Sequence, residues 1–405
     1  MASALKPRVM FVVTEDWYFW SHRLDLARAA RDMGYQVLVA TRITEYRERL
    51  EQEGFVLCPL NWERGGVNPV REAKAFLALL SLYRRQRPTL VCHVALKPIL
   101  YGAWAARVAS VPGVVNQVAG LGWAGSVDSW PGAFLHVILL RMLKWTLALS
   151  NSYATFQNHE DARELSDATT REAARAEVIH GSGVDTARFL PSREPAGMPV
   201  IMLASRMLWP KGIGDFIAAA RLLTSQGIKA RFVLVGMIDP ENPSHIPESQ
   251  LREWQAEHVI EWWGYREDMP DVLASAHVIV LPTYYGEGLP KVLLEAAACG
   301  RPIIATSIRG CAEIVRDGDN GLLIPPRDPA ALAEAITKLI EQPELRARMG
   351  ARGREIVLER FSSQRIVGEY LGVFRRACET SMPAHAAPRG NNDRIGRSTE
   401  PFMES

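Results

Sequence analysis

The sequence has few cysteines and almost no excess of charge of either sign, and each shortage excludes a class of protein. Five cysteines occur among 405 residues, scattered and without CxxC or Cys/His ligand spacing. From this distribution we expect no disulfide framework and no structural zinc site, and a reducing compartment. The 47 lysines and arginines against 45 acidic residues leave a formal charge of +2, which argues against a dedicated nucleic-acid binder.

A long uninterrupted hydrophobic run is also missing. The most apolar stretch, residues 131–149, contains His136, Arg141 and Lys144, and it is therefore a poor candidate for a membrane span. Residues 1–7 are short and polar and do not resemble a signal peptide. We expect a cytoplasmic protein.

Short apolar runs alternate with longer amphipathic stretches along most of the chain. The strand-like runs cover residues 9–13, 36–41, 55–60, 90–93, 114–118, 153–157, 178–180, 200–204, 231–236, 259–263, 278–282, 302–306 and 321–324. They are rich in Val, Ile and Leu, as strands buried on both faces are. The alternation predicts an α/β fold of two doubly wound, Rossmann-like domains with parallel sheets.

Composition marks the domain boundaries. A polar stretch rich in proline and glycine near residues 191–199 predicts a linker between an N-terminal domain, residues 1–192, and a second domain, residues 198–363. A final helix at about residues 364–380 is expected to pack back on the first domain, and residues 381–405 are expected to form a disordered tail. Facing domains of this kind bind ligands between the carboxyl ends of their strands.

The strongest motif is Glu287-Gly-Leu-Pro-Lys-Val-Leu-Leu-Glu295, directly after the strand predicted at 278–282. Pro290 suits a first helical position, so the free N–H groups of the helix start should point into the cleft and suit a diphosphate. The two glutamates are placed to accept hydrogen bonds from hydroxyls at the two ends of a nucleotide sugar. On spacing alone, a helix-start acid and an ordinary surface glutamate remain the alternative.

A second motif, Ser205-Arg206-Met-Leu-Trp-Pro-Lys211-Gly212, follows the strand predicted at 200–204. Arg206 offers a bidentate fork and Lys211 a point charge, and the two together can neutralise a leaving diphosphate. Taken alone, such cations in a loop are usually solvated.

In combination these residues resemble the donor half of the retaining family 4 glycosyltransferases, which have the GT-B fold of two facing Rossmann-like domains. The resemblance rests on Arg206-x4-Lys211-Gly212, the Glu287-x7-Glu295 pair, residues 264–268 and residues 317–323. Upstream, residues 97–102, 115–122, 156–158 and 181–185 resemble a branch that extends glycans on undecaprenyl diphosphate for cell-surface polysaccharides or protein glycosylation. One enzyme type of this branch adds N-acetylgalactosamine to a diacetylbacillosamine-diphospho-lipid.

The resemblance implies a metal-independent enzyme without a cofactor. It would move a sugar, an N-acetylhexosamine, from a UDP-sugar to an undecaprenyl-diphosphate-linked saccharide with retention of configuration. The implied catalytic residues are His93 and Glu287, the implied donor-binding residues are Arg206, Lys211, Gly288, Leu289 and Glu295, and the implied acceptor-binding residues are Lys97, Trp17, His22 and Arg23. For His93, which ends a predicted strand, a satisfied structural histidine is the alternative.

Three further segments need separate interpretation. Many relatives have two glycines after the first strand, whereas this chain has a bulky aromatic loop at residues 14–22, whose rings would stack on an acceptor sugar or pack in the core. The GxGxxG motif at residues 120–125 is followed by no helix pattern and is not interpreted as a dinucleotide site. The acidic pair Asp317 and Asp319 is interpreted as part of a turn, not as a metal site.

Residues 61–150 carry ten lysines and arginines against three acids. Within this region, residues 130–149 add Trp, Phe and Leu, a composition that suits a helix at an anionic bilayer surface. A buried helix of the first domain is the alternative. We expect peripheral attachment to the cytoplasmic face of the inner membrane.

Other functions stay open at this point. A nucleotide-sugar 2-epimerase of the same fold would turn over without an acceptor, and a sugar phosphorylase would need phosphate. A non-catalytic partner in glycan assembly would release no UDP. Donor-dependent release of UDP separates these alternatives.

Overall fold

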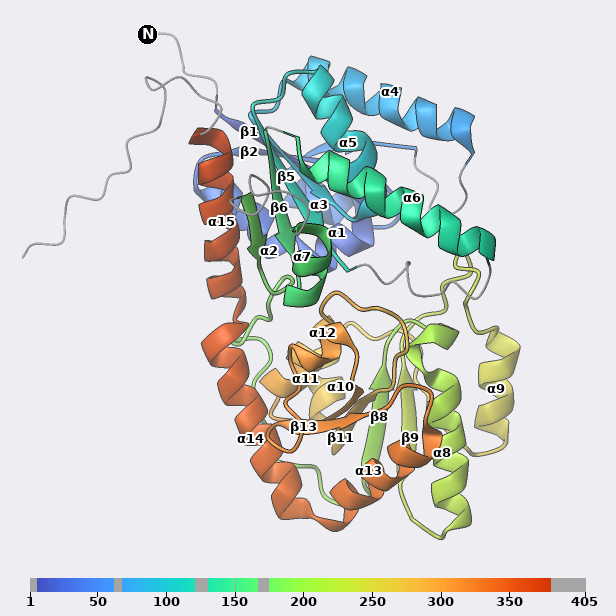
Figure 1. The fold of residues 1–405 in the computed structure, drawn as a ribbon. Helices are drawn as coiled ribbons and strands as arrows, with labels where there is room; N and C mark the ends of the chain where they lie inside the picture. Colours follow the sequence, from blue (N-terminus) through green and yellow to red (C-terminus); the bar gives the residue numbers. More distant parts are fainter. Residues whose placement is uncertain (1–5, 62–67, 121–129, 150, 167–174, 380–405) are drawn as a thin grey trace, which may run out of the picture.

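The computed structural model describes residues 6–61, 68–120, 130–149, 151–166 and 175–379. It contains two α/β domains, each built on a parallel sheet (Figure 1). The predicted fold class is therefore confirmed. The predicted tail, residues 381–405, lies outside the described residues.

The N-terminal domain has a seven-stranded parallel sheet with the strand order β3-β2-β1-β4-β5-β6-β7. Its strands are β1 (Arg8–Glu15), β2 (Gln36–Arg42), β3 (Val56–Pro59), β4 (Leu90–Val94), β5 (Gly113–Val118), β6 (Ser152–Phe156) and β7 (Ala176–Val178). Its helices are α1 (Asp16–His22), α2 (Leu24–Asp32), α3 (Arg47–Gln52), α4 (Pro69–Gln86), α5 (Leu96–Val108), α6 (Trp130–Leu147) and α7 (His159–Ser166). All residues of β4, β5 and β6 are buried, because helices cover both faces of the sheet.

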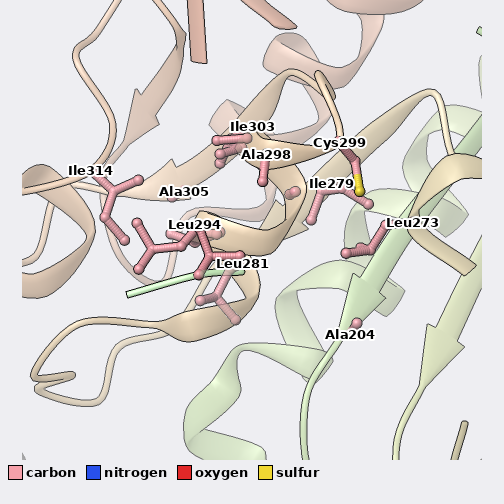
Figure 2. Close-up of a cluster of buried hydrophobic side chains, with 14 of the residues drawn as sticks. Ala204, Leu273, Ile279, Leu281, Leu294, Ala298, Cys299, Ile303, Ala305 and Ile314 are labelled. Carbon is pink, nitrogen blue, oxygen red and sulfur yellow. The ribbon is translucent and has the colours of Figure 1, made fainter. Parts of the chain in front are cut away.

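The C-terminal domain has a six-stranded parallel sheet with the order β10-β9-β8-β11-β12-β13. Its strands are β8 (Val200–Ala204), β9 (Arg231–Val235), β10 (Glu261–Trp262), β11 (Val278–Leu281), β12 (Ile303–Thr306) and β13 (Gly321–Ile324). Its helices are the 3-10 helix η2 (Trp209–Lys211), then α8 (Ile213–Ser225), α9 (Glu248–Ala256), α10 (Met269–Ala274), α11 (Lys291–Ala298), α12 (Arg309–Ala312), α13 (Pro329–Glu341) and α14 (Pro343–Arg360). Figure 2 shows part of its core, where Leu281 of β11 lies close to Leu294 of α11, and Ile303 of β12 lies close to Ala298 of the same helix.

The end of the chain joins the two domains. Helix α14 packs on α11 of the C-terminal domain, and α15 (Ser363–Glu379) packs on α2 and β5 of the N-terminal domain. Both helices run along one side of the molecule (Figure 1). The last described helix, which follows the C-terminal domain in sequence, therefore packs on the first domain.

A buried hydrogen-bond network connects four elements beneath the carboxyl edge of the N-terminal sheet. The Nε2 atom of His93 lies 2.8 Å from the Tyr83 hydroxyl, and its Nδ1 atom lies 2.8 Å from Oδ1 of Asn116. The Asn116 amide in turn donates to Oγ of Ser152 at 2.7 Å. Burial lowers the pKa of His93 to about 4, so the network contains a neutral imidazole near pH 7.

This network makes stability depend on pH. The pKa of an unfolded histidine is about 6.5, above the folded value, so protonation favours the unfolded state. We expect the free energy of unfolding to fall by about 3 kcal/mol as the pH drops from about 6.5 to about 4. Urea unfolding at several pH values should show a shallower decrease in His93→Gln than in the wild type. Parallel pH profiles for the two proteins would contradict this role of His93.

Candidate active site

A cavity of about 660 Å³ lies between the two domains, at the carboxyl ends of the strands of both sheets. It brings together most of the site residues predicted from the sequence: Trp17, His22 and Lys97 from the N-terminal domain, and Arg206, Lys211, Glu287, Gly288 and Leu289 from the C-terminal domain. We call this cavity the cleft.

Arg206 and Lys211 both line the cleft, and each is held by a carboxylate. Arg206 follows β8, and its Nη1 atom lies 2.7 Å from Oδ2 of Asp239. Lys211 ends η2 and forms an ion pair with Glu287. These pairs orient the two cations toward the cavity, and an incoming anion would compete with the carboxylates for them.

The loop from Glu287 to Pro290 leads into α11, and the helix starts one residue later than predicted. Pro290 occupies the N-cap position with an extended backbone, and no side chain caps the helix. Its first-turn N–H groups therefore lack a side-chain acceptor at the positive end of the helix dipole. Thr283 donates a hydrogen bond to Oε1 of Glu287 at 3.3 Å and helps to orient this carboxylate.

The backbones of Gly120 and Gly288 touch across the floor of the cleft. A Cβ atom on Gly120, whose φ is +104°, would lie 2.5 Å from the Gly288 nitrogen. A Cβ atom on Gly288 would lie 2.5 Å from the carbonyl oxygen of Ala119. Gly120 begins the GxGxxG motif set aside above, whose residues 121–125 lie outside the described residues. Gly120, the first glycine of that motif, therefore serves the close contact between the two domains and not a dinucleotide site.

Glu295 lies in an adjoining cavity of about 450 Å³, which shares His22, Ser182 and Lys291 with the cleft. Burial raises the pKa of Glu295, and the Lys291 ammonium 3.5 Å away partly offsets that effect. Tyr265 also lines this second cavity. The two glutamates of the motif thus face two connected spaces.

Lys291 is a site residue that the sequence reasoning missed. Its Nζ atom donates a hydrogen bond to the carbonyl oxygen of Ser21 at 2.6 Å, across the two domains. A cation in the first turn of a helix is opposed by the helix dipole. A lysine at this unfavourable position is therefore a sign, readable from the sequence, that its ammonium group has a partner outside the helix.

Besides Glu295, which lines only the adjoining cavity, two predicted residues line neither cavity. His93 is fully buried with both ring nitrogens in the network described above. Arg23 is 1% exposed; its guanidinium lies 5.7 Å from the centre of the Tyr370 ring on α15 and donates to the His22 carbonyl oxygen. Neither side chain lines the cleft, and the roles of His93 near the transferred sugar and of Arg23 at the acceptor stay predictions.

The segment after β1 that lines the cleft is a helix, where the sequence reasoning expected a loop. β1 continues to Glu15, and residues 16–22 form α1. On this helix the rings of Tyr18 and His22 stack in parallel, 4.2 Å apart. Burial, with the positive charges of Lys291 and two arginines, lowers the pKa of His22 well below its usual value. The stacked Tyr18 and His22 rings therefore form a flat, uncharged surface on this side of the cleft.

Two remaining predicted positions lie as follows. Lys97, at the start of α5, lines the cleft, and its Nζ atom lies 2.9 Å from Oε1 of Glu72. The segment at Asp317 forms a turn, as predicted, in which its carboxylate accepts a hydrogen bond from the Leu323 nitrogen at 2.9 Å.

Comparison with known proteins shows relatives along nearly the whole chain. The chain is 25% identical over 382 residues to an N,N'-diacetylbacillosaminyl-diphospho-undecaprenol alpha-1,3-N-acetylgalactosaminyltransferase of Campylobacter jejuni, covering 91% of this chain and 98% of that protein. It is 27% identical over 391 residues to the putative glycosyltransferase EpsD of Bacillus subtilis, covering 91% and 96%.

Solved structures share the fold. A sucrose-phosphate synthase from Thermosynechococcus elongatus superposes with a TM-score of 0.76 at 20% identity, covering 93% of this chain and 100% of that one. HepE of Anabaena, in complex with UDP and glucose, gives a TM-score of 0.71 at 19% identity, covering 90% and 98%.

Family models match each domain separately. The model "Glycosyl transferase 4-like" matches residues 8–152, and the model "Glycosyl transferases group 1" matches residues 198–342. Together they cover more than half of the chain, one on each side of the cleft. The chain therefore belongs to the family 4-like glycosyltransferases, with the GT-B fold.

Proposed function

We propose that this protein is a retaining hexosyltransferase that moves an N-acetylhexosamine from a UDP-sugar to an undecaprenyl-diphosphate-linked saccharide, in the assembly of a surface polysaccharide or a glycoprotein glycan. The observation that carries the proposal is the convergence of Arg206, Lys211 and the uncapped start of α11 on one cleft. The name of the Campylobacter jejuni relative, which describes a diphospho-undecaprenol acceptor, supports the choice of acceptor.

The two cations supply the electrostatic part of the reaction. When the donor binds, its diphosphate takes Lys211 and Arg206 from their carboxylate partners, and Glu287 becomes free to accept hydrogen bonds from the transferred sugar. The bond between the anomeric carbon and the diphosphate oxygen breaks as the acceptor oxygen bonds to the same carbon on the same face. The acceptor proton passes to the departing diphosphate. Catalysis is then positional and electrostatic, without a metal ion.

The adjoining cavity accommodates the nucleoside part of the donor. The Glu295 carboxylate is placed to accept hydrogen bonds from ribose hydroxyls, and Lys291 lies between it and the cleft. On the opposite wall, the stacked rings of Tyr18 and His22 offer a flat surface for an acceptor sugar.

A mixed apolar and basic surface on α5 and α6 suits attachment to a membrane. Trp145 is 69% exposed, and Trp104 and Met142 are also exposed. Arg107 and Arg141, both exposed, belong to the same two helices. Aromatic side chains together with cations favour an anionic bilayer surface. On the basis of this surface we propose peripheral attachment to the cytoplasmic face of the inner membrane. Among the described helices, none has the length and apolarity needed to cross a bilayer.

The reaction is tested by measuring UDP release from a panel of UDP-sugars, with and without undecaprenyl-diphosphate-linked saccharides. We expect release from one UDP-N-acetylhexosamine that depends on the acceptor. Conversion of a donor without acceptor would instead identify an epimerase. No release with any pair would contradict a UDP-sugar transferase.

Variants of the same domain test the role of the cations in this assay. Lys211→Ala should lower kcat by roughly 100-fold or more, the usual effect of removing a group that stabilises transition-state charge. Lys229→Ala, which removes an exposed lysine of the same domain, should leave kcat unchanged. Equal turnover in the two variants would refute the assignment of Lys211.

Membrane attachment is tested by flotation with vesicles that contain anionic lipid. Trp145→Glu places an acid on the exposed face of α6 and should reduce the bound fraction severalfold, because it removes apolar contact and adds repulsion. Leu190→Glu changes another exposed apolar residue outside this surface and serves as the control. A wild-type protein that does not float, or that floats equally after both changes, would contradict the proposal.

A further inference from the structure

We propose that His159, His180 and Glu313 form a binding site for a divalent transition-metal ion such as Zn²⁺, located between the two domains and outside the cleft. Their candidate ligand atoms all lie within 4.8 Å of one another. The inference does not depend on the proposed transfer reaction, because none of the three side chains lines the cleft.

The donor set fits such an ion in type and in spacing. Two imidazoles and one carboxylate are ligands that zinc and its neighbours in the first transition row prefer. His159 Nδ1 lies 3.1 Å from one oxygen of Glu313, and His180 Nε2 lies 3.5 Å from the other. Ligand bonds of about 2.0–2.2 Å separate neighbouring ligands by roughly 3–3.6 Å, so both histidine–glutamate distances already match this spacing, and a small approach of the ligand atoms, which all lie within 4.8 Å, would let them share one ion.

Each side chain is held in place by neighbouring structure. The backbone nitrogen of His159, at the first residue of α7, donates to Glu313 at 3.0 Å. The His180 ring packs edge-on against Phe361, with the ring centres 5.2 Å apart. Among the described residues, the Nε2 atom of His180 is buried without a hydrogen-bond partner, although it points to the Glu313 carboxylate. A metal ion would satisfy this atom.

The site draws its ligands from both domains. His159 and His180 belong to the N-terminal domain, whereas Glu313 directly follows α12 of the C-terminal domain. Beside them, Arg309 of α12 pairs with Glu160 and Glu164 of α7 across the same interface. An ion bound by all three ligands would therefore stabilise the closed arrangement of the domains. The side chain of His159 is 56% exposed, which leaves room for water as a fourth ligand.

The experiment uses the full-length chain after treatment with a chelator. Titration with Zn²⁺ by calorimetry and with Co²⁺ by visible absorption should show one saturable equivalent, and Zn²⁺ should raise the thermal midpoint. His159→Ala and Glu313→Gln should each weaken binding at least tenfold and abolish the rise in the midpoint. His258→Asn removes an exposed histidine elsewhere and should bind like the wild type.

Three results would overturn the proposal. The first is the absence of a saturable equivalent in the wild type. The second is wild-type affinity in both His159→Ala and Glu313→Gln. The third is an equal loss in His258→Asn, which would mean adventitious binding by surface histidines. None of these readouts depends on sugar transfer, so failure here and failure of the proposed reaction are distinguishable.

Discussion

The contact between Gly120 and Gly288 sets the distance between the two walls of the cleft. Neither position has space for a Cβ atom, so the loop that carries Glu287 lies directly against the N-terminal domain. Gly310 supports the loop from behind, where a Cβ atom would lie 2.6 Å from the carbonyl oxygens of Glu287 and Gly288. The three glycines thus fix the position of the Glu287 carboxylate and of the start of α11 in the cleft. The stacked rings of Tyr18 and His22 on α1 line the same cleft.

The two cations of the cleft, Arg206 and Lys211, each have a carboxylate partner that an anionic ligand could replace. A cation left alone in a partly closed cleft would be costly, and pairing with a carboxylate offsets part of that desolvation cost. Arg206 with Asp239 and Lys211 with Glu287 therefore form a resting state in which each positive group has a partner. A diphosphate offers more negative charge than either carboxylate, and in the proposed reaction its binding would release Glu287 for the sugar. The same residues thus serve the unliganded protein and the proposed reaction.

The sequence predicted the strands and the edge of the sheets at which the cleft lies, because buried parallel strands and helix starts leave clear patterns. It did not predict the direction of individual side chains. His93 lies near the end of β4, but its ring enters the network of Tyr83 and Asn116; side chains alternate between faces along a strand, so proximity to the edge does not decide access to the cleft. Arg23 and Lys291 depend on contacts with distant segments, Tyr370 and Ser21, that no local pattern records.

The central claim is that the cations of the cleft recognise a diphosphate, and calorimetric titration with UDP and with uridine tests it most directly. UDP should bind roughly 100-fold more tightly than uridine, because hydrogen bonds to charged groups contribute about 1.5 kcal/mol or more each. Arg206→Ala should lose much of that difference while it keeps the affinity for uridine. Equal affinities of the wild-type protein for UDP and uridine would contradict the account.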